Sequence, residues 1–383
     1  MDRRKVLCIL ILTTLYFMSL SLIATVIARY SRDLGVSIET TGLLWSILFI
    51  TALILRPLVG YLADRFGAFK ILLLGVLTLS ASSLLYAMGT FLYLVFGRVV
   101  QGVSTAFFIS PSIATTAILA GNQAGMVLGL RSALISLSRV IAPPIAGFIY
   151  DTLGGKVVFI TSFIASLPLI LILTILSGKD MRNVKVDGSG SDNAGNVKWG
   201  SVISRELILM VFVGVMMGSS FMTLTSLVQM HYRDLGYAAK VFGAFYMALS
   251  LIGLITRLIS GKLISKYRPE LVSLTGFIFQ GIGALLLALF YIEPYSYIAA
   301  TIYGFGIGLI IPANQFKVIS IAPKGGENRA IALLNMGFDG GAFIGPIVYS
   351  YVASVYGYVK SYILLTIPSL VAIVLLIIMY KSG

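Results

Sequence analysis

The stretch RPLVGYLADRFGAFK (residues 56–70) separates two long apolar runs of this chain. A related stretch, RLISGKLISKYR, follows 201 positions later at residues 257–268, where arginine, glycine, leucine and a basic residue recur at the same spacing. The tetrapeptide RDLG repeats in the same way, because it occurs at residues 32–35 and again at 233–236. A constant offset of 201 over this much sequence predicts two homologous halves in one protein.

The composition is that of a polytopic membrane protein. Of the 383 residues, 58% are hydrophobic and 11% are charged, whereas about a quarter of an ordinary soluble domain is charged. Apolar runs of about 20 residues are long enough to cross a hydrocarbon core of roughly 30 Å. The sequence predicts twelve spans near residues 5–29, 38–63, 69–90, 92–118, 125–150, 156–177, 202–231, 238–264, 270–291, 295–318, 328–354 and 358–380.

Basic residues predict the orientation. The net charge of +14 comes mainly from basic clusters at one set of span ends, and basic residues mark cytoplasmic loops. We therefore expect both termini in the cytoplasm, and a polar, flexible cytoplasmic linker at residues 178–200. Because the charge lies at span ends, a nucleic-acid partner is not expected. The single cysteine, Cys8, excludes an internal disulfide and a cysteine-cluster metal site.

The elbow at residues 56–70 resembles the signature between helices 2 and 3 of the major facilitator superfamily, Gly-x-Leu-Ala-Asp-Arg-x-Gly followed by basic residues. The chain departs from that signature at Ala68-Phe69, where Lys70 stands in for the usual basic residues. The resemblance covers essentially the whole chain. It implies an all-α fold of two six-helix bundles, residues 1–177 and 201–383, with the substrate site at their interface.

The same resemblance implies a secondary transporter that works by alternating access. Its gating residues would be Gly60, Asp64, Arg65, Gly67 and Lys70. In the family, Asp64 would face the positive N-terminus of helix 11, near residues 326–329, and close the cytoplasmic side. Ser265 takes the place of Asp64 in the second half, so the corresponding latch should be weaker there.

Arg98 lies in LVFGRVVQG (residues 94–102), which is similar to the helix-4 signature of the family, Leu-x-x-Arg-x-x-Gln-Gly. That resemblance implies a role in proton transfer and cavity electrostatics. Arg98 is also close enough to a span end to extend toward the membrane surface. Gln101 and Thr105 follow at one and two turns on the same helix face, so they would share any cavity with it.

Asp339 is the acid that the sequence places deepest in a span, about ten residues or 15 Å from the cytoplasmic end. Burial favours the protonated form of a carboxylic acid, which suits a proton-coupling residue. The alternative is a structural hydrogen bond or ion pair. Residues 339–346, DGGAFIGP, resemble the helix-11 pattern of efflux members, but helix 1 lacks the acid that many drug antiporters carry there.

Arg139, in the middle of the fifth span, is expected to meet an anion, either Asp339 or a substrate. Arg131 is expected to be structural, and His231 is expected to be solvated at an outer helix end. Polar and aromatic residues of the spans that line the family's cavity complete the predicted substrate site, whose members are Tyr16, Gln101, Thr105, Arg139, Phe221, Thr225, Tyr303 and Asn335.

The leading interpretation is proton-coupled export of small amphipathic organic molecules across the cell membrane. Two alternatives stay open: a proton-coupled symporter of organic anions, suggested by Arg98 and Arg139, and a non-transporting receptor or scaffold. The sequence shows no paired carboxylates, catalytic triad spacing or metal-ligand set, so neither an enzyme nor a cofactor is expected. The expected partners are a small-molecule substrate, protons and lipid, and the expected oligomeric state is a monomer.

Overall fold

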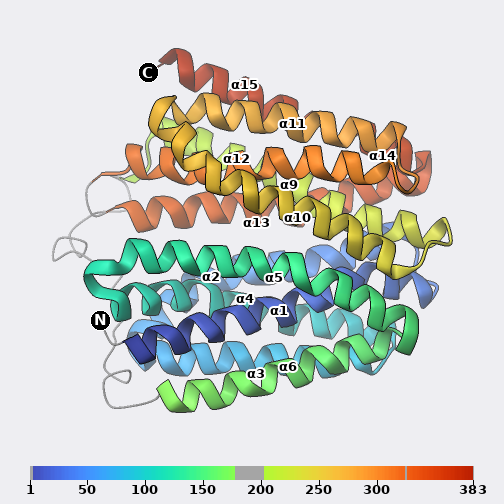
Figure 1. Ribbon diagram of the computed structural model, residues 1–383, viewed down its shortest axis with the longest axis horizontal. Coiled ribbons are helices and arrows are strands. Elements are labelled where there is room, and N and C mark those ends of the chain that lie inside the picture. Colours follow the sequence, from blue (N-terminus) through green and yellow to red (C-terminus); the bar gives the residue numbers. More distant parts are fainter. Residues whose placement is uncertain (1–2, 177–201, 324–325, 383) are drawn as a thin grey trace. The chain divides into compact units, whose positions relative to one another are not determined.

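The structure is a computed structural model that describes residues 3–176, 202–323 and 326–382. The predicted linker at 178–200 lies outside these residues. Among the described residues the regular elements are all helices, and twelve helical segments are long and apolar enough to cross a membrane. The all-α fold with twelve spans is therefore confirmed (Figure 1).

Two compact units make up the chain. Unit 1 comprises Met1–Val36, Ile47–Gly190 and Ala238–Gly243, and unit 2 comprises Ser37–Ser46, Ser191–Tyr237 and Ala244–Gly383. The start of the second span therefore packs with unit 2, and the start of the eighth packs with unit 1. The predicted boundaries at residues 177 and 201 stay a prediction.

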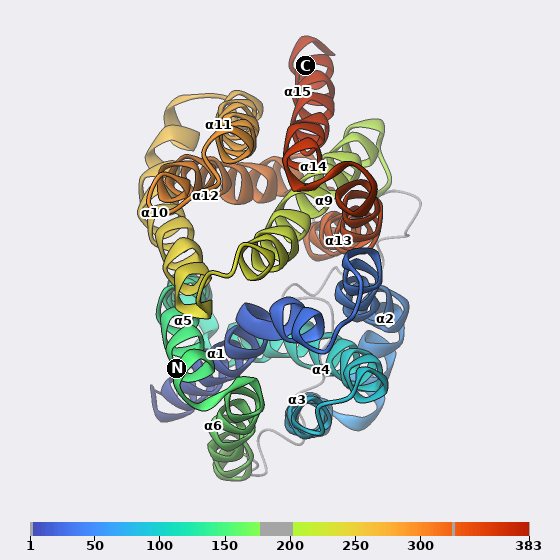
Figure 2. The ribbon, with the colours of Figure 1, turned by 90° about the vertical axis from the view of Figure 1, so that its right-hand side faces the viewer.

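The first half of the chain contributes six long helices and a short 3₁₀ turn. They are α1 (Arg3–Asp33), α2 (Ile38–Phe66), α3 (Ala68–Ala87), α4 (Phe91–Ala120), η1 (Gly121–Gln123), α5 (Ala124–Leu153) and α6 (Gly155–Leu176). Within unit 1, α1 packs on α5 and α6, and α3 packs on α4 and α6. Figure 2 shows these helices nearly end-on.

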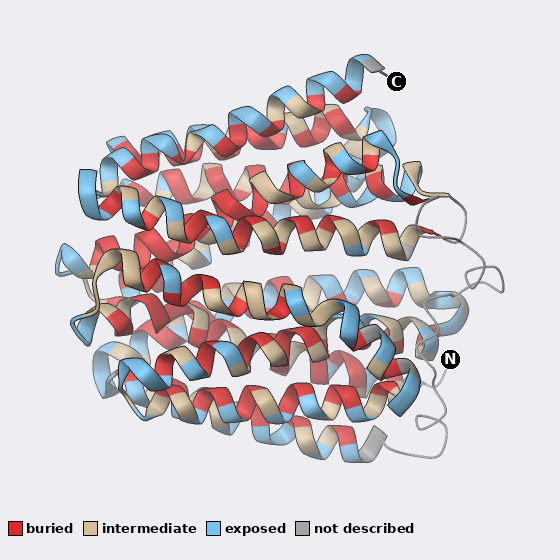
Figure 3. Cartoon of the chain, turned by 180° about the vertical axis from the view of Figure 1, so that it is seen from behind, coloured by how far each residue is buried: buried red, intermediate tan, exposed pale blue. Residues whose placement is uncertain are grey.

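The second half contributes α9 (Arg205–Asp234), α10 (Ala239–Lys266), α11 (Pro269–Leu289), α12 (Ser296–Ile321), α13 (Glu327–Tyr356), α14 (Tyr358–Leu364) and α15 (Thr366–Ser382). Within unit 2, the most extensive packing joins α9 to α13 and α11 to α12. The twelfth span consists of α14 and α15, which meet at Leu365. Along the helices, buried and exposed faces alternate (Figure 3), as expected when one side packs on neighbouring helices and the other meets the surroundings.

The repeated RDLG tetrapeptide forms the same helix end twice. After α1, the amide of Gly35 donates to the Arg32 carbonyl at 3.0 Å, and Gly35 has a φ of 81°. After α9, the amide of Gly236 donates to the Arg233 carbonyl at 3.0 Å, and Gly236 has a φ of 80°. A left-handed residue after the last turn is favoured at glycine, which has no Cβ to clash. The sequence repeat is therefore also a structural repeat.

The elbow between the second and third spans is shorter than the sequence predicted. α2 continues to Phe66 and α3 begins at Ala68, so Gly67 alone connects them. Gly67 has a φ of 85°, and its amide donates to the Ala63 carbonyl at 2.9 Å. The glycine of the signature is required because a side chain would strain this backbone conformation.

Close helix packing in unit 2 depends on glycines of α9 and α13. A Cβ on Gly218 of α9 would overlap the Phe338 carbonyl, and a Cβ on Gly341 of α13 would overlap the Val215 carbonyl. A Cβ on Gly345 would lie 2.6 Å from the Ser219 carbonyl oxygen. Small residues that let backbones approach are the usual means of helix association in membranes.

Candidate functional site

A buried polar cluster in unit 1 contains two of the predicted site residues. The Arg98 Nη1 donates to Gln101 Oε1 at 3.0 Å, and the same oxygen accepts a hydrogen bond from the Tyr86 hydroxyl at 2.7 Å. Arg98 is 2% exposed and Gln101 is fully buried. A Cβ on Gly97 would overlap the ring of Tyr86 on α3, because it would lie only 2.7 Å from the Cδ1 atom of that ring. Glycine at position 97 therefore lets α3 bring a phenol to the arginine.

Tyr16 and Thr105 have local structural partners. The Tyr16 hydroxyl lies 2.8 Å from the Ser104 hydroxyl, which donates to the Gly75 carbonyl at 2.7 Å. These hydrogen bonds join α1, α4 and α3. The Tyr16 ring also stacks on Phe108 with centroids 3.6 Å apart, and the Thr105 hydroxyl donates to the Gly102 carbonyl of its own helix at 2.9 Å.

Unit 2 contains a similar polar connection around Tyr303. Gln280 Nε2 donates to the Tyr303 hydroxyl at 2.8 Å, and that hydroxyl lies 2.8 Å from the Ser220 hydroxyl. The three side chains are fully buried and join α11, α12 and α9. Phe221 and Thr225 are also buried on α9, where the Thr225 hydroxyl donates to the Phe221 carbonyl at 2.9 Å.

Asp339 lies inside α13 and is 4% exposed. A carboxylic acid in this position is costly to ionise, and such groups are functional candidates in membrane proteins. Asn335, one turn earlier on the same helix, is partly buried. The carboxyl group is thus in the interior of a span, while its predicted role in proton coupling stays a prediction.

The two arginines of α5 differ in their surroundings. Arg131 is 5% exposed and donates to the Ser112 hydroxyl at 2.7 Å. Arg139 is partly buried, and the structure gives it no hydrogen bond or ion pair with the described part of the chain. That Arg139 meets an anion, either Asp339 or a substrate, stays a prediction.

The predicted gating residues surround the elbow at Gly67. Arg65 and Lys70 are exposed, and Arg65 Nη1 donates to the Tyr61 hydroxyl at 3.1 Å. The side-chain surroundings of Gly60 and Asp64 lie outside what the structure describes. The latch formed by Asp64 therefore stays a prediction.

The prediction that His231 is solvated is wrong. His231 is 7% exposed, its ring stacks on Tyr358 with centroids 4.4 Å apart, and its Nδ1 lies 3.1 Å from the Tyr362 hydroxyl. The ring of Tyr291 also packs on His231, with ring centroids 4.9 Å apart. These tyrosines come from segments 60 or more residues away in the sequence, so the sequence around the helix end alone could not place them beside the histidine.

A charged cluster near the start of α11 was not predicted. Glu270, whose side chain is 2% exposed, lies 2.8 Å from the Lys317 ammonium and 3.5 Å from the Arg268 guanidinium. Lys317 also lies 3.3 Å from Glu206. The cluster joins α9, α11 and α12, and no sequence spacing signals it, because Glu270 and Lys317 are 47 positions apart. Among the described residues, no group of three or more His, Cys, Asp or Glu side chains could hold a metal ion.

The sequence matches known transporters over most of its length. The profile of the Major Facilitator Superfamily matches residues 9–326. Multidrug resistance protein 2 of Bacillus subtilis (strain 168) is 27% identical over 69% of this chain and 68% of its own. Quinolone resistance protein NorA of Staphylococcus aureus (strain COL) is 25% identical over 87% of this chain and 86% of its own. The efflux pump PmrA of Streptococcus pneumoniae is 24% identical over 89% and 87%.

Solved structures show the same fold. A bacterial homologue of the human lysosomal transporter Spinster, in an inward-facing and occupied conformation, aligns with a TM-score of 0.81 at 14% identity, over 99% of this chain and 96% of its own. The nucleoside transporter NupG, in a mutant form, aligns with a TM-score of 0.78 at 15% identity, over 98% of this chain and 100% of its own.

Proposed function

The chain belongs to the Major Facilitator Superfamily, and on that premise we propose that it exports small amphipathic organic molecules by proton-coupled alternating access. The curated relatives named above are drug-resistance and efflux proteins, which supports export of drug-like compounds. Twelve candidate spans place the protein in a membrane. The basic clusters of the sequence support a cell-membrane orientation with both termini in the cytoplasm.

The observation that carries the proton-coupling proposal is the burial of Asp339. A carboxyl group that is 4% exposed inside a span can hold a proton in one conformation and release it in another, provided that the two conformations differ in polarity around it. A bound proton then shifts the conformational equilibrium by its difference in affinity for the two states. Asp339 would thereby convert a proton gradient into a directional cycle.

Arg98, in unit 1, is proposed as a second residue that takes part in proton coupling. Its guanidinium is held through Gln101, whose carbonyl oxygen also accepts from Tyr86. A positive charge fixed in a buried site raises the cost of admitting a second cation to that site. Asp64 and the elbow are proposed to close the cytoplasmic side, as the superfamily signature implies.

Transport into everted membrane vesicles tests the proposal. With a fluorescent quaternary ammonium compound as substrate, whose permanent charge prevents passive trapping by protonation, uptake should accelerate when the vesicle interior is acidified. Asp339→Asn should abolish that acceleration, and Asp339→Glu should preserve part of it. Equal protein abundance in the vesicles is the control. Acceleration that survives in Asp339→Asn would show that this carboxyl group does not couple the proton.

Symport of organic anions is the second candidate. It is favoured by Arg139, a partly buried cation in α5 that has no hydrogen bond or ion pair with the described residues. An anionic substrate would compensate such a charge. The same vesicles distinguish the two candidates, because a symporter moves substrate and protons in the same direction, and Arg139→Gln should then reduce uptake of anions alone.

A further inference from the structure

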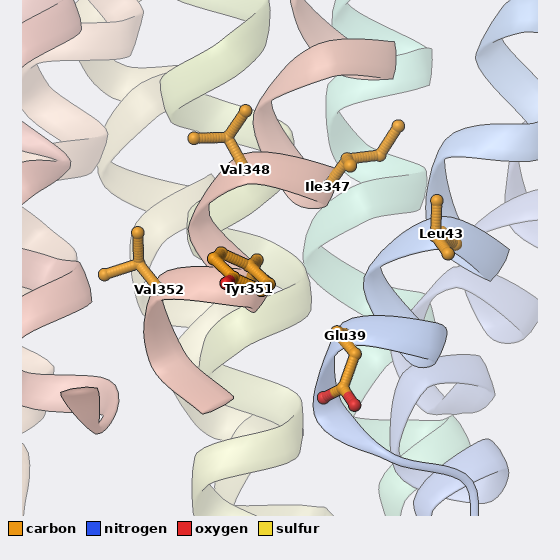
Figure 4. Close-up of a pocket in the computed structure, with 6 residues that line it drawn as sticks. All are labelled: Glu39, Leu43, Ile347, Val348, Tyr351 and Val352. Carbon is orange, nitrogen blue, oxygen red and sulfur yellow. The ribbon is translucent and has the colours of Figure 1, made fainter. Parts of the chain in front are cut away.

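Unit 2 has two exposed surfaces that differ in polarity. One is a groove of about 420 Å³ between the first turns of α2 and the last turns of α13 (Figure 4), and its lining is almost wholly apolar. The groove is lined by Glu39, Leu43, Ile347, Val348, Tyr351 and Val352. Successive spans run in opposite directions, so the end of α10 and the start of α11 lie at the other end of the unit. The exposed surface there is basic.

The exposed face of α10 changes from apolar to basic toward the end of the helix. Leu251, Ile255 and Leu258 are exposed on α10, the last of them by 70%. Lys262 and Lys266 are also exposed and continue at a spacing of four residues, so all five side chains lie on one helix face. At 1.5 Å per residue, Lys262 lies about 6 Å beyond Leu258, and Lys266 lies about 12 Å beyond it. A face that is apolar along the span and basic at its end matches the passage from hydrocarbon to lipid headgroups.

The other side of this helix end is packed inside unit 2. Leu263 and Ile264 pack on a buried apolar cluster of α11 and α12, whose members are Val272, Leu309 and Ala313. The lysines on the opposite side of the helix therefore face the surroundings of the unit.

The connection from α10 to α11 adds a third positive charge and places two tyrosines beside the basic residues. It consists of Tyr267 and Arg268 alone. The Arg268 guanidinium lies 4.4 Å from the centroid of the Tyr380 ring, and its Nη1 donates to the Tyr380 carbonyl at 3.3 Å. The Lys266 ammonium lies 5.4 Å from the centroid of the Tyr267 ring. Both tyrosines are exposed, and exposed tyrosines at span ends are typical of the headgroup level of a membrane.

Two acidic residues near this surface are balanced inside unit 2. Glu270 is buried and lies 2.8 Å from the Lys317 ammonium and 3.5 Å from the Arg268 guanidinium. Lys317 also lies 3.3 Å from Glu206, so these four groups together carry no net charge. The structure gives the two exposed lysines of α10 no ion pair with the described part of the chain. Their charges can therefore be compensated by an anion from the surroundings.

We propose that Lys262, Lys266 and Arg268 form a docking site for the headgroup of an anionic phospholipid. The lipid phosphate lies between the two lysines, which are one helical turn apart, at about 5–6 Å between Cβ atoms. The acyl chains extend from there along the exposed apolar face of α10 that Leu258 and Ile255 form. The positive charge favours an anion, and the apolar face that leads away from it favours a lipid over a soluble phosphate.

Lipid binding to the purified protein, followed by native mass spectrometry, tests the site. The protein in a non-ionic detergent is titrated with dioleoylphosphatidylglycerol or with dioleoylphosphatidylcholine, whose headgroup has no net charge. The first phosphatidylglycerol molecule should bind about thirtyfold more tightly than the first phosphatidylcholine molecule, at about fivefold for each lysine. Equal binding of the two lipids would overturn the proposal.

Charge variants assign the preference to these lysines. The double variant Lys262→Gln, Lys266→Gln should weaken phosphatidylglycerol binding about thirtyfold and leave phosphatidylcholine binding unchanged. The double variant Lys262→Arg, Lys266→Arg keeps both charges and should keep the preference. Lys360→Gln is the matched control, because Lys360 is an exposed lysine 5.5 Å from the Tyr356 ring at the other end of the spans, and it should have no effect. Unchanged phosphatidylglycerol binding in the glutamine variant would contradict the site.

Glycerol phosphate, a soluble headgroup fragment, separates a lipid site from a site for free phosphates. It should give no adduct at the lipid concentrations used. An adduct that disappears in the glutamine variant would show a site for soluble phosphates and would make the lipid assignment wrong. No substrate or proton gradient is present in these measurements, so their outcome is independent of the proposed function.

Discussion

Substitution of Gly341 by alanine should separate α9 from α13. A Cβ at this position would overlap the Val215 carbonyl oxygen and lie 2.7 Å from the Ser219 amide nitrogen. Ordinary van der Waals contact begins near 3.4 Å, so a shift of about 0.7 Å would clear only the Ser219 nitrogen, and the closer Val215 oxygen requires a larger one. Since the obstructing atoms belong to the backbone, no side-chain rotation can relieve the overlap.

The expected loss of stability follows from two opposing effects. Overpacking of a close contact costs about 1–3 kcal/mol, and a backbone obstruction favours the upper end of that range. Replacing glycine by alanine inside a helix recovers about 1 kcal/mol. The net expectation for Gly341→Ala is therefore a decrease of about 2 kcal/mol in the free energy of unfolding.

The adjacent glycine provides a matched control. A Cβ on Gly340 would have no atom within 4 Å, so Gly340→Ala should keep the stability of the protein or raise it by up to about 1 kcal/mol. Unfolding of both variants in detergent, followed by helical circular dichroism against denaturant, measures the difference. If Gly341→Ala and Gly340→Ala unfold at the same denaturant midpoint, the close contact between α9 and α13 does not require glycine at position 341.

Three further predictions concern the polar contacts. Lys317→Met should destabilise the protein by about 3 kcal/mol, because it removes the closest cation from the buried Glu270; adding Glu270→Gln should restore much of the loss in a double-mutant cycle. Asp151→Asn should cost about 1 kcal/mol in an unfolding titration, since it removes a negative charge at the N-terminus of α10. His231→Ala should cost about 2 kcal/mol through the lost stack on Tyr358, and unchanged stability would contradict a packing role.

The order of the spans was predictable because it depends on local sequence. Twenty or so apolar residues must form a helix in a membrane, since no water is present to satisfy the backbone. The twelve predicted spans accordingly match the helices to within a few residues, apart from the break at Leu365 in the last one. The RDLG repeat was also reliable, because a glycine in the left-handed conformation follows both α1 and α9.

The sequence also placed Asp339 and Arg98 in the interior of spans, because depth along a helix is a count of residues. Which side chains meet them was decided by packing between helices. Tyr86 on α3 and Gln280 on α11 belong to the buried polar clusters. Neither was predicted, because the polar and aromatic site residues were chosen from the spans that line the family's cavity. His231 was misjudged because its tyrosine neighbours come from other helices.

By itself, therefore, the amino-acid sequence determined the number of helices, their ends and the duplication of the chain. The tertiary structure decided which faces touch, as at Gly42 against Ser350 and Gly341 against Val215. The physical reason is that helix formation in a membrane is fixed by hydropathy and backbone hydrogen bonds within one segment. The contacts between helices depend on side-chain shape at positions far apart in the chain.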